Sequence, residues 1–292
     1  IFIPNEYDKL MSLIGAEGTN AYTSTDMTVY VEDIPSNQIE NWARIEADRF
    51  MNPVIRGFHT ELETVYEEKN MSLTNDFRKA LEAMDGMLFP DHPYGTQTVL
   101  GTQEHLKNPS ITNIKNYHKT YYVPNNMAIC LSGDFDPDEM VGILEKYFGQ
   151  MQPNKNLPEH DFTTKSIIES VLEKDVYGLE AENIMIGWKY PGAGSRDAMI
   201  AEIASSILYN GSAGLIDLNV NQKQTTLGAF GMPYTRPDAG EFLLMGNPKA
   251  GQTLEEVRDI LIAETEKLRN GDFDEALLTG TINNLKLGMM NL

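Results

Sequence analysis

The chain has 292 residues, of which 41% are hydrophobic and 23% are charged, a composition typical of a folded protein with room for two ordinary domains. Its formal net charge is −20, from 43 acidic and 23 basic residues. This argues against nucleic acid or an anionic membrane surface as main partner, because phosphate binding needs clustered Lys and Arg. No apolar run approaches the length of a transmembrane helix, so we predict no membrane span. Cys130 is the only cysteine, which excludes an intrachain disulfide and a cysteine-based zinc site, and we interpret it as buried filler.

Both ends of the chain have the character of internal cuts. The chain opens at Ile1-Phe2-Ile3-Pro4, without an initiator methionine or a signal-peptide pattern. It ends at Leu292 inside a predicted helix. We expect sequence to be missing at both ends, and the compartment stays open.

The first part of the chain predicts a helix, a hairpin and a second helix. Apolar residues recur at helical spacing over residues 5–14, and a glycine-rich stretch ends that helix. Two short strands over residues 19–24 and 27–31 flank the turn Thr25-Asp26, so a β-hairpin is the simplest account. Ser36 can cap the helix that follows.

Further elements are predicted up to about residue 150. They are a helical pattern through Leu88, a loop over residues 90–95, a helix over residues 110–122, an apolar strand over residues 126–132, and a helix that starts at Asp136 or Pro137.

The second half repeats this order loosely. Residues 151–166 lose all periodicity and are rich in Pro, Asn, Lys and Thr, as in a linker. A strand over 183–189, a helix over 197–209, hairpin-like material, a strand over 241–245 and a long helix from Leu254 come next. We predict an α+β fold with two related domains, each a largely antiparallel sheet packed with helices, the second incomplete. The predicted boundaries are 1–152 for the first domain, 153–166 for the linker and 167–292 for the second domain.

Two glutamates share one face of a predicted helix. Thr60 and Glu63 form a capping box that starts this helix at or just before Glu61. Seven residues return almost to the same side of a helix, so Glu61 and Glu68 lie on one face, about 10 Å apart along the axis. Such a pair either orients a metal and its ligands or faces water as an ordinary acidic surface, and this stretch alone favours the second interpretation.

The sequence gives little support to a dinucleotide-binding loop, a serine nucleophile or a zinc-binding histidine pair. The loop from Tyr190 to Ser195 lies between a strand and a helix like a dinucleotide loop, but Asp197 stands in place of the third glycine, which favours a plain turn. No Gly-x-Ser-x-Gly elbow is present. No two histidines are three or four residues apart, and we interpret each as a surface or loop residue: His59, His92, His105, His118 and His160.

Six motifs in order resemble the insulinase/pitrilysin-type zinc metallopeptidases, the inverzincins. They cover residues up to about 150, and residues 160–292 look like the second domain of that family. The motifs are Gly15 to Ser24 with Asp26, Thr28 and Tyr30; Glu61 with Glu68; His92-Pro93-Tyr94-Gly95; Leu100-Gly101-Thr102; Tyr122 to Asn126; and Gly133-Asp134.

The resemblance implies a role for five residues. Glu68 matches the third zinc ligand, and Glu61 matches the catalytic-site acid that orients a zinc-bound histidine. Asn20, Ala21 and Tyr22 match the edge strand on which the family binds its peptide substrate as an added β-strand. In such a site three protein ligands leave a fourth position on zinc for water.

The chain departs from the family in one respect. His-x-x-Glu-His, which supplies two zinc ligands and the general base, is absent from residues 1–292. By family spacing it should lie roughly a dozen residues before Ile1, so the first domain would lack its N-terminal strand and zinc-motif helix. We therefore expect this chain alone neither to bind zinc tightly nor to hydrolyse peptides.

The resemblance implies that the parent protein is a zinc metalloendopeptidase that cleaves peptides or unfolded polypeptides. Its partner would be a second half of the same polypeptide, or a homologous subunit, that closes a chamber around the substrate. The alternative is a non-catalytic family member that binds peptides or supports an active subunit. A nucleotide-binding protein that uses the loop at Gly192 is a weaker alternative.

Overall fold

The computed structural model describes residues 6–55 and 57–290, and it divides into two compact units. The N-terminal unit comprises residues 1–71 and 99–161, and the C-terminal unit comprises residues 72–98 and 162–292. The expected fold class is confirmed, because helices combine with purely antiparallel strand pairs among the described residues. The expected cuts at the two ends fall outside the described residues.

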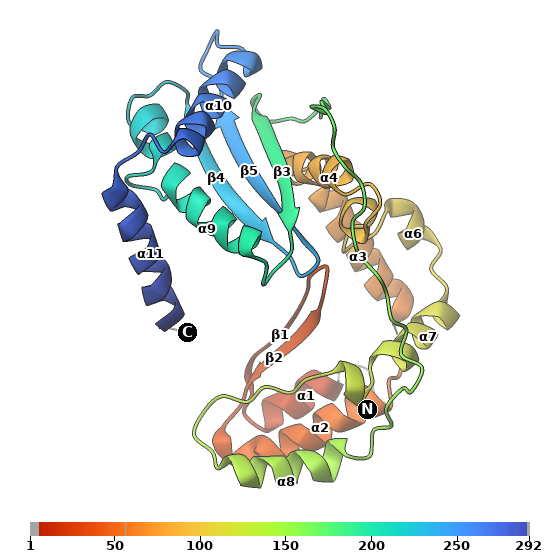
Figure 1. Ribbon diagram of the computed structural model, residues 1–292. Coiled ribbons are helices and arrows are strands. Elements are labelled where there is room, and N and C mark those ends of the chain that lie inside the picture. Colours follow the sequence, from red (N-terminus) through yellow and green to blue (C-terminus); the bar gives the residue numbers. More distant parts are fainter. Residues whose placement is uncertain (1–5, 56, 291–292) are drawn as a thin grey trace. The chain divides into compact units, whose positions relative to one another are not determined.

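Three helices enclose the core of the N-terminal unit beside a β-hairpin (Figure 1). These elements are α1 (Glu6–Leu13), β1 (Glu17–Thr23), β2 (Thr28–Asp33), α2 (Ile39–Met51, after a 3-10 turn at Ser36–Gln38) and α8 (Pro137–Phe148). The buried core residues are Met11 from α1, Ile39, Trp42 and Ala43 from α2, and Met140 from α8. In α2 they recur at helical spacing, so the periodicity that predicts the helix also supplies its buried face.

The predicted hairpin is confirmed. β1 and β2 pair antiparallel, with Ala21 opposite Tyr30 and Thr23 opposite Thr28. The N–H of Ser24 donates to the carbonyl of Met27 at 2.8 Å and closes the turn. Every residue of β1 is exposed, so the strand is held by its backbone pairing to β2 rather than by a buried face.

The N-terminal unit also contains further helices. They are α3 (Phe58–Ser72, which passes into the C-terminal unit at its last residue), α6 (Gln103–Lys107), α7 (Ile111–Tyr121) and the 3-10 turn Pro124–Asn126. α3 begins at Phe58, three residues before the expected start at Glu61.

The strand expected over residues 126–132 is wrong. Residues 127–132 pair with no strand among the described parts of the chain, although Met127 has the extended backbone that the apolar run favours. A strand requires a hydrogen-bonding neighbour, and local sequence does not reveal whether one exists. Cys130 lies in this segment and is exposed, which corrects its interpretation as buried filler.

A three-stranded antiparallel sheet organises the C-terminal unit, in the order β3-β5-β4. α9 and α10 cover one face of this sheet, and α4 covers the other (Figure 1). The elements are β3 (Ile184–Pro191), β4 (Gly228–Thr235), β5 (Ala239–Asn247), α4 (Asp76–Leu88), α5 (Pro93–Thr96), α9 (Arg196–Leu208), the π-helical turn Asp217–Asn221, α10 (Leu254–Asn270) and α11 (Glu275–Met290).

The two faces of β5 contact different cores. Leu244 packs with Val257 and Leu261 of α10, whereas Leu243 packs with Met84 and Leu88 of α4. Residues 72–98 belong to the C-terminal unit through this second contact, although the sequence-based boundary assigns them to the first domain. The predicted domain boundaries therefore stay a prediction. The contacts of α4 and α5 place these two helices in the other unit.

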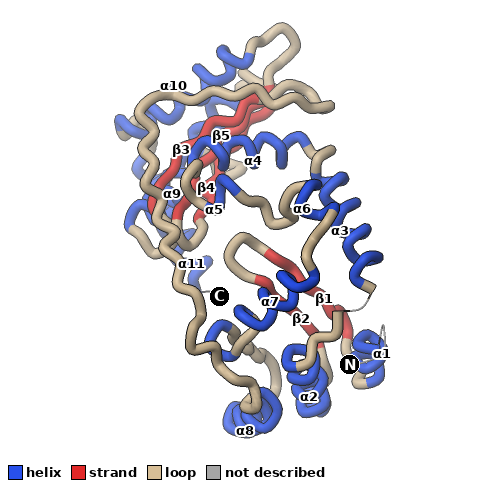
Figure 2. Tube along the Cα trace, turned by 90° about the vertical axis from the view of Figure 1, so that its right-hand side faces the viewer, coloured by secondary structure: helices blue, strands red, loops and turns tan. Residues whose placement is uncertain are grey.

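No helix or strand interrupts the chain between α8 and β3 (Figure 2), a stretch that includes the predicted linker 153–166. Asp91 holds part of it: its carboxylate accepts hydrogen bonds from the N–H groups of Lys165 and Ser166 at 2.7 and 2.8 Å. None of the helices that the structure describes has the length and apolarity to cross a membrane.

Candidate functional site

The two candidate acids lie on the exposed surface of α3. Leu62 and Val65 are half-buried and hold the helix, as expected, while Glu61 and Glu68 are both exposed. Neither carboxylate forms a hydrogen bond or ion pair with another described residue. The side chains are therefore available to an external ligand, and by helical geometry they are about 10 Å apart along the axis.

The candidate substrate strand is equally accessible. Asn20, Ala21 and Tyr22 are exposed, and β1 pairs with β2 and with no other described strand. The side-chain oxygen of Asn20 accepts a hydrogen bond from the N–H of Ala21 at 2.8 Å. A peptide added along β1 would compete with this local contact for the same backbone donor.

The described residues contain no group of three His, Cys, Asp or Glu side chains that could hold a metal ion. Three or four such ligands are the usual requirement for zinc. Glu61 and Glu68 do not meet it by themselves, so the described part of this chain does not form a complete zinc site and no chemical step can be derived from it.

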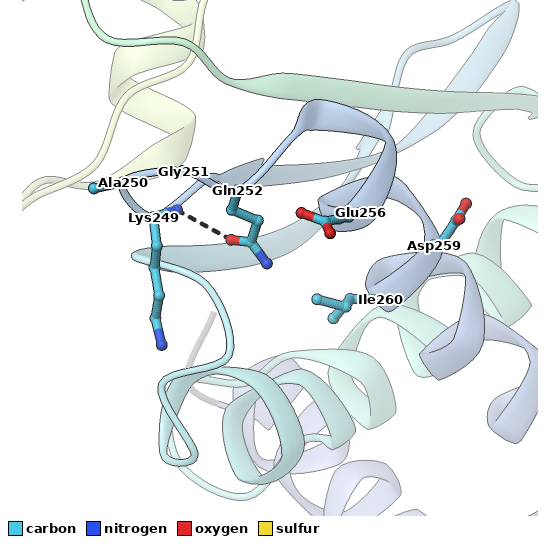
Figure 3. A pocket seen from close by; sticks show the side chains of 7 residues that line it. All are labelled: Lys249, Ala250, Gly251, Gln252, Glu256, Asp259 and Ile260. Atoms are coloured by element: carbon cyan, nitrogen blue, oxygen red, sulfur yellow. Dashed lines mark hydrogen bonds between the residues drawn. The ribbon is translucent and has the colours of Figure 1, made fainter.

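One surface cavity, in the C-terminal unit, is a poor binding site. It has a volume of about 560 Å³ and lies at the start of α10 (Figure 3). Gln252 accepts a hydrogen bond from the N–H of Lys249, Glu256 accepts one from the N–H of Thr253, and Asp259 pairs with Arg258. Because its polar groups already cap the helix or pair with neighbours, the cavity offers little to a ligand.

The loop at Gly192 is a structural turn. A Cβ at Gly192 would lie 2.1 Å from the carbonyl oxygen of Pro237, so the close backbone approach explains the glycine. The N–H of Ala193 donates to the carbonyl of Arg236, and the hydroxyl of Ser195 caps α9. The hydrogen-bond donors of this loop are therefore already bonded within the fold. This supports a plain turn, as the sequence favours, rather than a nucleotide-binding site.

A buried ionic cluster, which the sequence analysis missed, links α4 to the β4–β5 turn. The Arg236 guanidinium lies 2.8 Å from a carboxylate oxygen of Asp85 and 3.6 Å from one of Glu241, and Glu241 is fully buried. Burial, followed by the nearby Asp85 carboxylate, raises the pKa of Glu241 to about 8. Burial also raises the pKa of Asp85. No local pattern marks these residues, because they come together from distant segments.

His92 lies beside this cluster, in the expected loop, and it is buried rather than on the surface. It is 1% exposed, and its Nδ1 accepts a hydrogen bond from the N–H of Tyr94 at 3.1 Å, which caps α5. Its Nε2 lies 3.6 Å from a carboxylate oxygen of Asp238, which also accepts a hydrogen bond from the Tyr94 hydroxyl. Residues 92–95 therefore form the expected loop, which contains the single helical turn α5, and this loop packs against the β4–β5 turn.

The fold is that of a class of protease structures. The chain superposes on a crystal structure of a protease from Helicobacter pylori with a TM-score of 0.84 and 22% identity, covering 98% of this chain and 70% of that one. It superposes on the periplasmic protease PqqL from Escherichia coli with a TM-score of 0.75 and 15% identity, covering 97% of this chain and 33% of that one. At these identities the likeness concerns the fold.

The family profile described as "Peptidase M16 inactive domain" matches residues 110–285, which is more than half of the chain. The chain belongs to the M16 peptidase family, and this confirms the resemblance to insulinase-type proteins.

Curated relatives carry the names of zinc proteases and related peptidases. Zinc protease PqqE of Helicobacter pylori is 25% identical over 292 residues, which cover 94% of this chain and 63% of that protein. Insulin-degrading enzyme of Mus musculus is 27% identical over 166 residues, which cover 54% of this chain and 16% of that protein. The chain thus spans less than two thirds of the length of these relatives.

Proposed function

We propose that these residues belong to a zinc-dependent endopeptidase that cleaves peptides or unfolded polypeptides bound as an added β-strand. The observation that carries this proposal is β1, whose residues Asn20, Ala21 and Tyr22 are exposed and pair with no described strand but β2. An edge strand of this kind binds through main-chain hydrogen bonds, so it tolerates many peptide sequences.

Glu68 and Glu61 support the metal part of the proposal. Both carboxylates are exposed on α3 and have no partner among the described side chains. Glu68 would bind zinc, and Glu61 would orient a zinc-bound histidine. When bound in such a site, zinc lowers the pKa of its water so that hydroxide is available near neutral pH. The other two ligands and the general base would come from outside residues 1–292.

A second half of the same polypeptide, or a homologous subunit, would complete the protein around its substrate. The relatives are longer than this chain, which is consistent with further domains. On this proposal, the 292-residue chain alone is inactive.

The alternative is a non-catalytic family member that binds peptides or supports an active partner. The matched profile favours it specifically, since it is described as an inactive domain and covers residues 110–285. The unpaired acids on α3 speak against it, because a supporting subunit does not require them. The coding sequence upstream of Ile1 decides between the two: His-x-x-Glu-His about a dozen residues ahead supports the peptidase, and its absence supports the alternative.

The direct test is Glu68→Gln in the full-length protein. We expect the variant to lose bound zinc, measured by elemental analysis, and to lose cleavage of an unstructured peptide. Glu63→Gln is the matched control, since Glu63 is also exposed on α3 but lies on another face. Zinc content and cleavage unchanged in Glu68→Gln would overturn the assignment of the ligand.

A further inference from the structure

A second surface cavity lies wholly within the N-terminal unit. It has a volume of about 410 Å³, within the size range of small-molecule sites. Three segments meet at it: the end of α2, one face of α7 and the residues just after α8. The lining residues are Phe50, Met51, Pro53, Ile55, Lys115, His118, Lys119, Tyr122, Gln150, Met151 and Gln152.

Stacked aromatic rings give this cavity a firm apolar wall. Tyr122 stacks on Phe50, with ring centroids 6.1 Å apart and an interplanar angle of 24°. His118 stacks against Tyr122, with ring centroids 4.5 Å apart and an interplanar angle of 8°. Burial lowers the pKa of His118, which favours its neutral form and adds to the apolar character of the wall. An apolar ligand group would find preformed contacts here.

The rim of the cavity is basic and contains no acid. Lys115 and Lys119 are four residues apart on α7 and therefore lie on the same face of the helix. Both side chains are exposed, and neither forms an ion pair with a described carboxylate. This is unusual for a chain with 43 acidic residues against 23 basic ones.

The helix dipole accounts for only part of this arrangement. Lys119 lies in the last turn of α7, where a positive charge interacts favourably with the carbonyl end of the helix. Lys115 lies one turn earlier and gains little from the dipole, which falls off within the last turn. The dipole also gives no reason for the apolar wall beside the two ammonium groups.

We propose that this cavity binds a carboxylate carried on an apolar group. The carboxylate pairs with Lys115 and Lys119, and the apolar group packs against Phe50, Tyr122 and Met151. Two sources share this chemistry: the C-terminal residue of a peptide with an apolar side chain, and a free aliphatic or aromatic acid. The site uses none of the residues assigned to zinc or to the substrate strand, so it stands or falls independently of the proposed function.

The test is ligand-observed NMR with the 292-residue chain and paired probes. The probes are N-acetyl-leucine with N-acetyl-leucinamide, a tetrapeptide ending in leucine with a free or amidated C-terminus, and 4-phenylbutyrate. We expect saturation transfer to the free acids and little to the amides, with binding that weakens as salt is raised. Equal binding of acids and amides would overturn the proposal.

Variants locate the site. Lys115→Met combined with Lys119→Met should weaken binding of the acids by about five-fold or more, since each exposed ion pair contributes modestly. Lys9→Met is the control: Lys9 is exposed on α1, forms no ion pair with a described residue, and its variant should bind as the parent does. Equal losses in the double variant and the control would also overturn the site. Tighter binding of the free peptide than of N-acetyl-leucine identifies a peptide C-terminus as the source, and equal binding identifies a small acid.

Discussion

The hydroxyl groups of Tyr30 and Tyr122 lie 3.1 Å apart and form a hydrogen bond between residues 92 positions apart in the sequence. Tyr30 is on β2, directly opposite Ala21 of the proposed substrate strand, and Tyr122 directly follows α7. The Arg49 guanidinium lies 4.4 Å from the centre of the Tyr30 ring, so a cation–π contact reinforces the same junction. This junction ties the hairpin to the helices of the N-terminal unit.

Removing the Tyr122 hydroxyl tests this junction. Tyr122→Phe keeps the ring stacking but leaves the Tyr30 hydroxyl without its partner, so we expect a loss of about 0.5–1.5 kcal/mol in unfolding free energy by urea denaturation. Tyr117→Phe is the control, since Tyr117 is 59% exposed and should change stability far less. Equal stability of the two variants would show that the hydrogen bond does not hold the hairpin.

Glu241 predicts a pH dependence of stability. Its pKa is raised from an ordinary carboxyl value to about 8, mainly by burial, so the folded protein holds a proton that the unfolded chain releases between roughly pH 4.5 and 8. Stability from this group is present at low pH and is lost as the pH rises through that window. The contribution to the slope is at most about 1.4 kcal/mol per pH unit.

Glu241→Gln, which cannot ionise, measures this contribution. We expect the loss of unfolding free energy between pH 5 and 8 to be smaller in the variant than in the parent chain. Glu266→Gln on α10, a partly exposed residue, should leave the slope unchanged. A parent and a Glu241→Gln variant with parallel pH profiles would contradict the raised pKa.

Asp91 predicts local protection of the segment between α8 and β3. Hydrogen bonds from the backbone of Lys165 and Ser166 and from the Thr164 hydroxyl hold the pKa of Asp91 well below its usual range. Its stabilising effect is therefore present above pH 4 and is lost as the pH falls through the depressed pKa. Asp91→Ala should make the amides of Lys165 and Ser166 exchange with deuterium several-fold faster, while the amides of β5 keep their protection. Unchanged exchange at both amides would show that Asp91 does not hold the segment.

Asp136 caps α8. Its carboxylate accepts hydrogen bonds from the N–H groups of Asp138 and Glu139 at 2.9 and 3.0 Å. Asp136→Ala should lower the unfolding free energy by about 1 kcal/mol. Asp136→Asn should lower it much less, because the amide oxygen can accept the same hydrogen bonds. Thermal unfolding of the two variants checks the order, and an alanine variant as stable as the asparagine variant would contradict it.

Local sequence predicted those elements whose stabilising contacts are themselves local. The hairpin at residues 17–33 follows from its turn and the two short strands that flank it, and α8 follows from Asp136 and Pro137 at its start. The order of short motifs was enough to place the chain in its family. The roles of Glu61, Glu68 and residues 20–22 came from that resemblance and stay predictions.

Sequence alone therefore determined the fold class, the hairpin and the family of this protein, because turn chemistry, helix caps and motif order are properties of neighbouring residues. Only the tertiary structure decided that residues 127–132 form no strand, that His92 is buried, and that Arg236 joins Asp85 and Glu241. Each of these depends on a partner far along the chain. Strand pairing, burial and the pKa of a buried acid are set by what folding brings together, and local sequence does not contain that information.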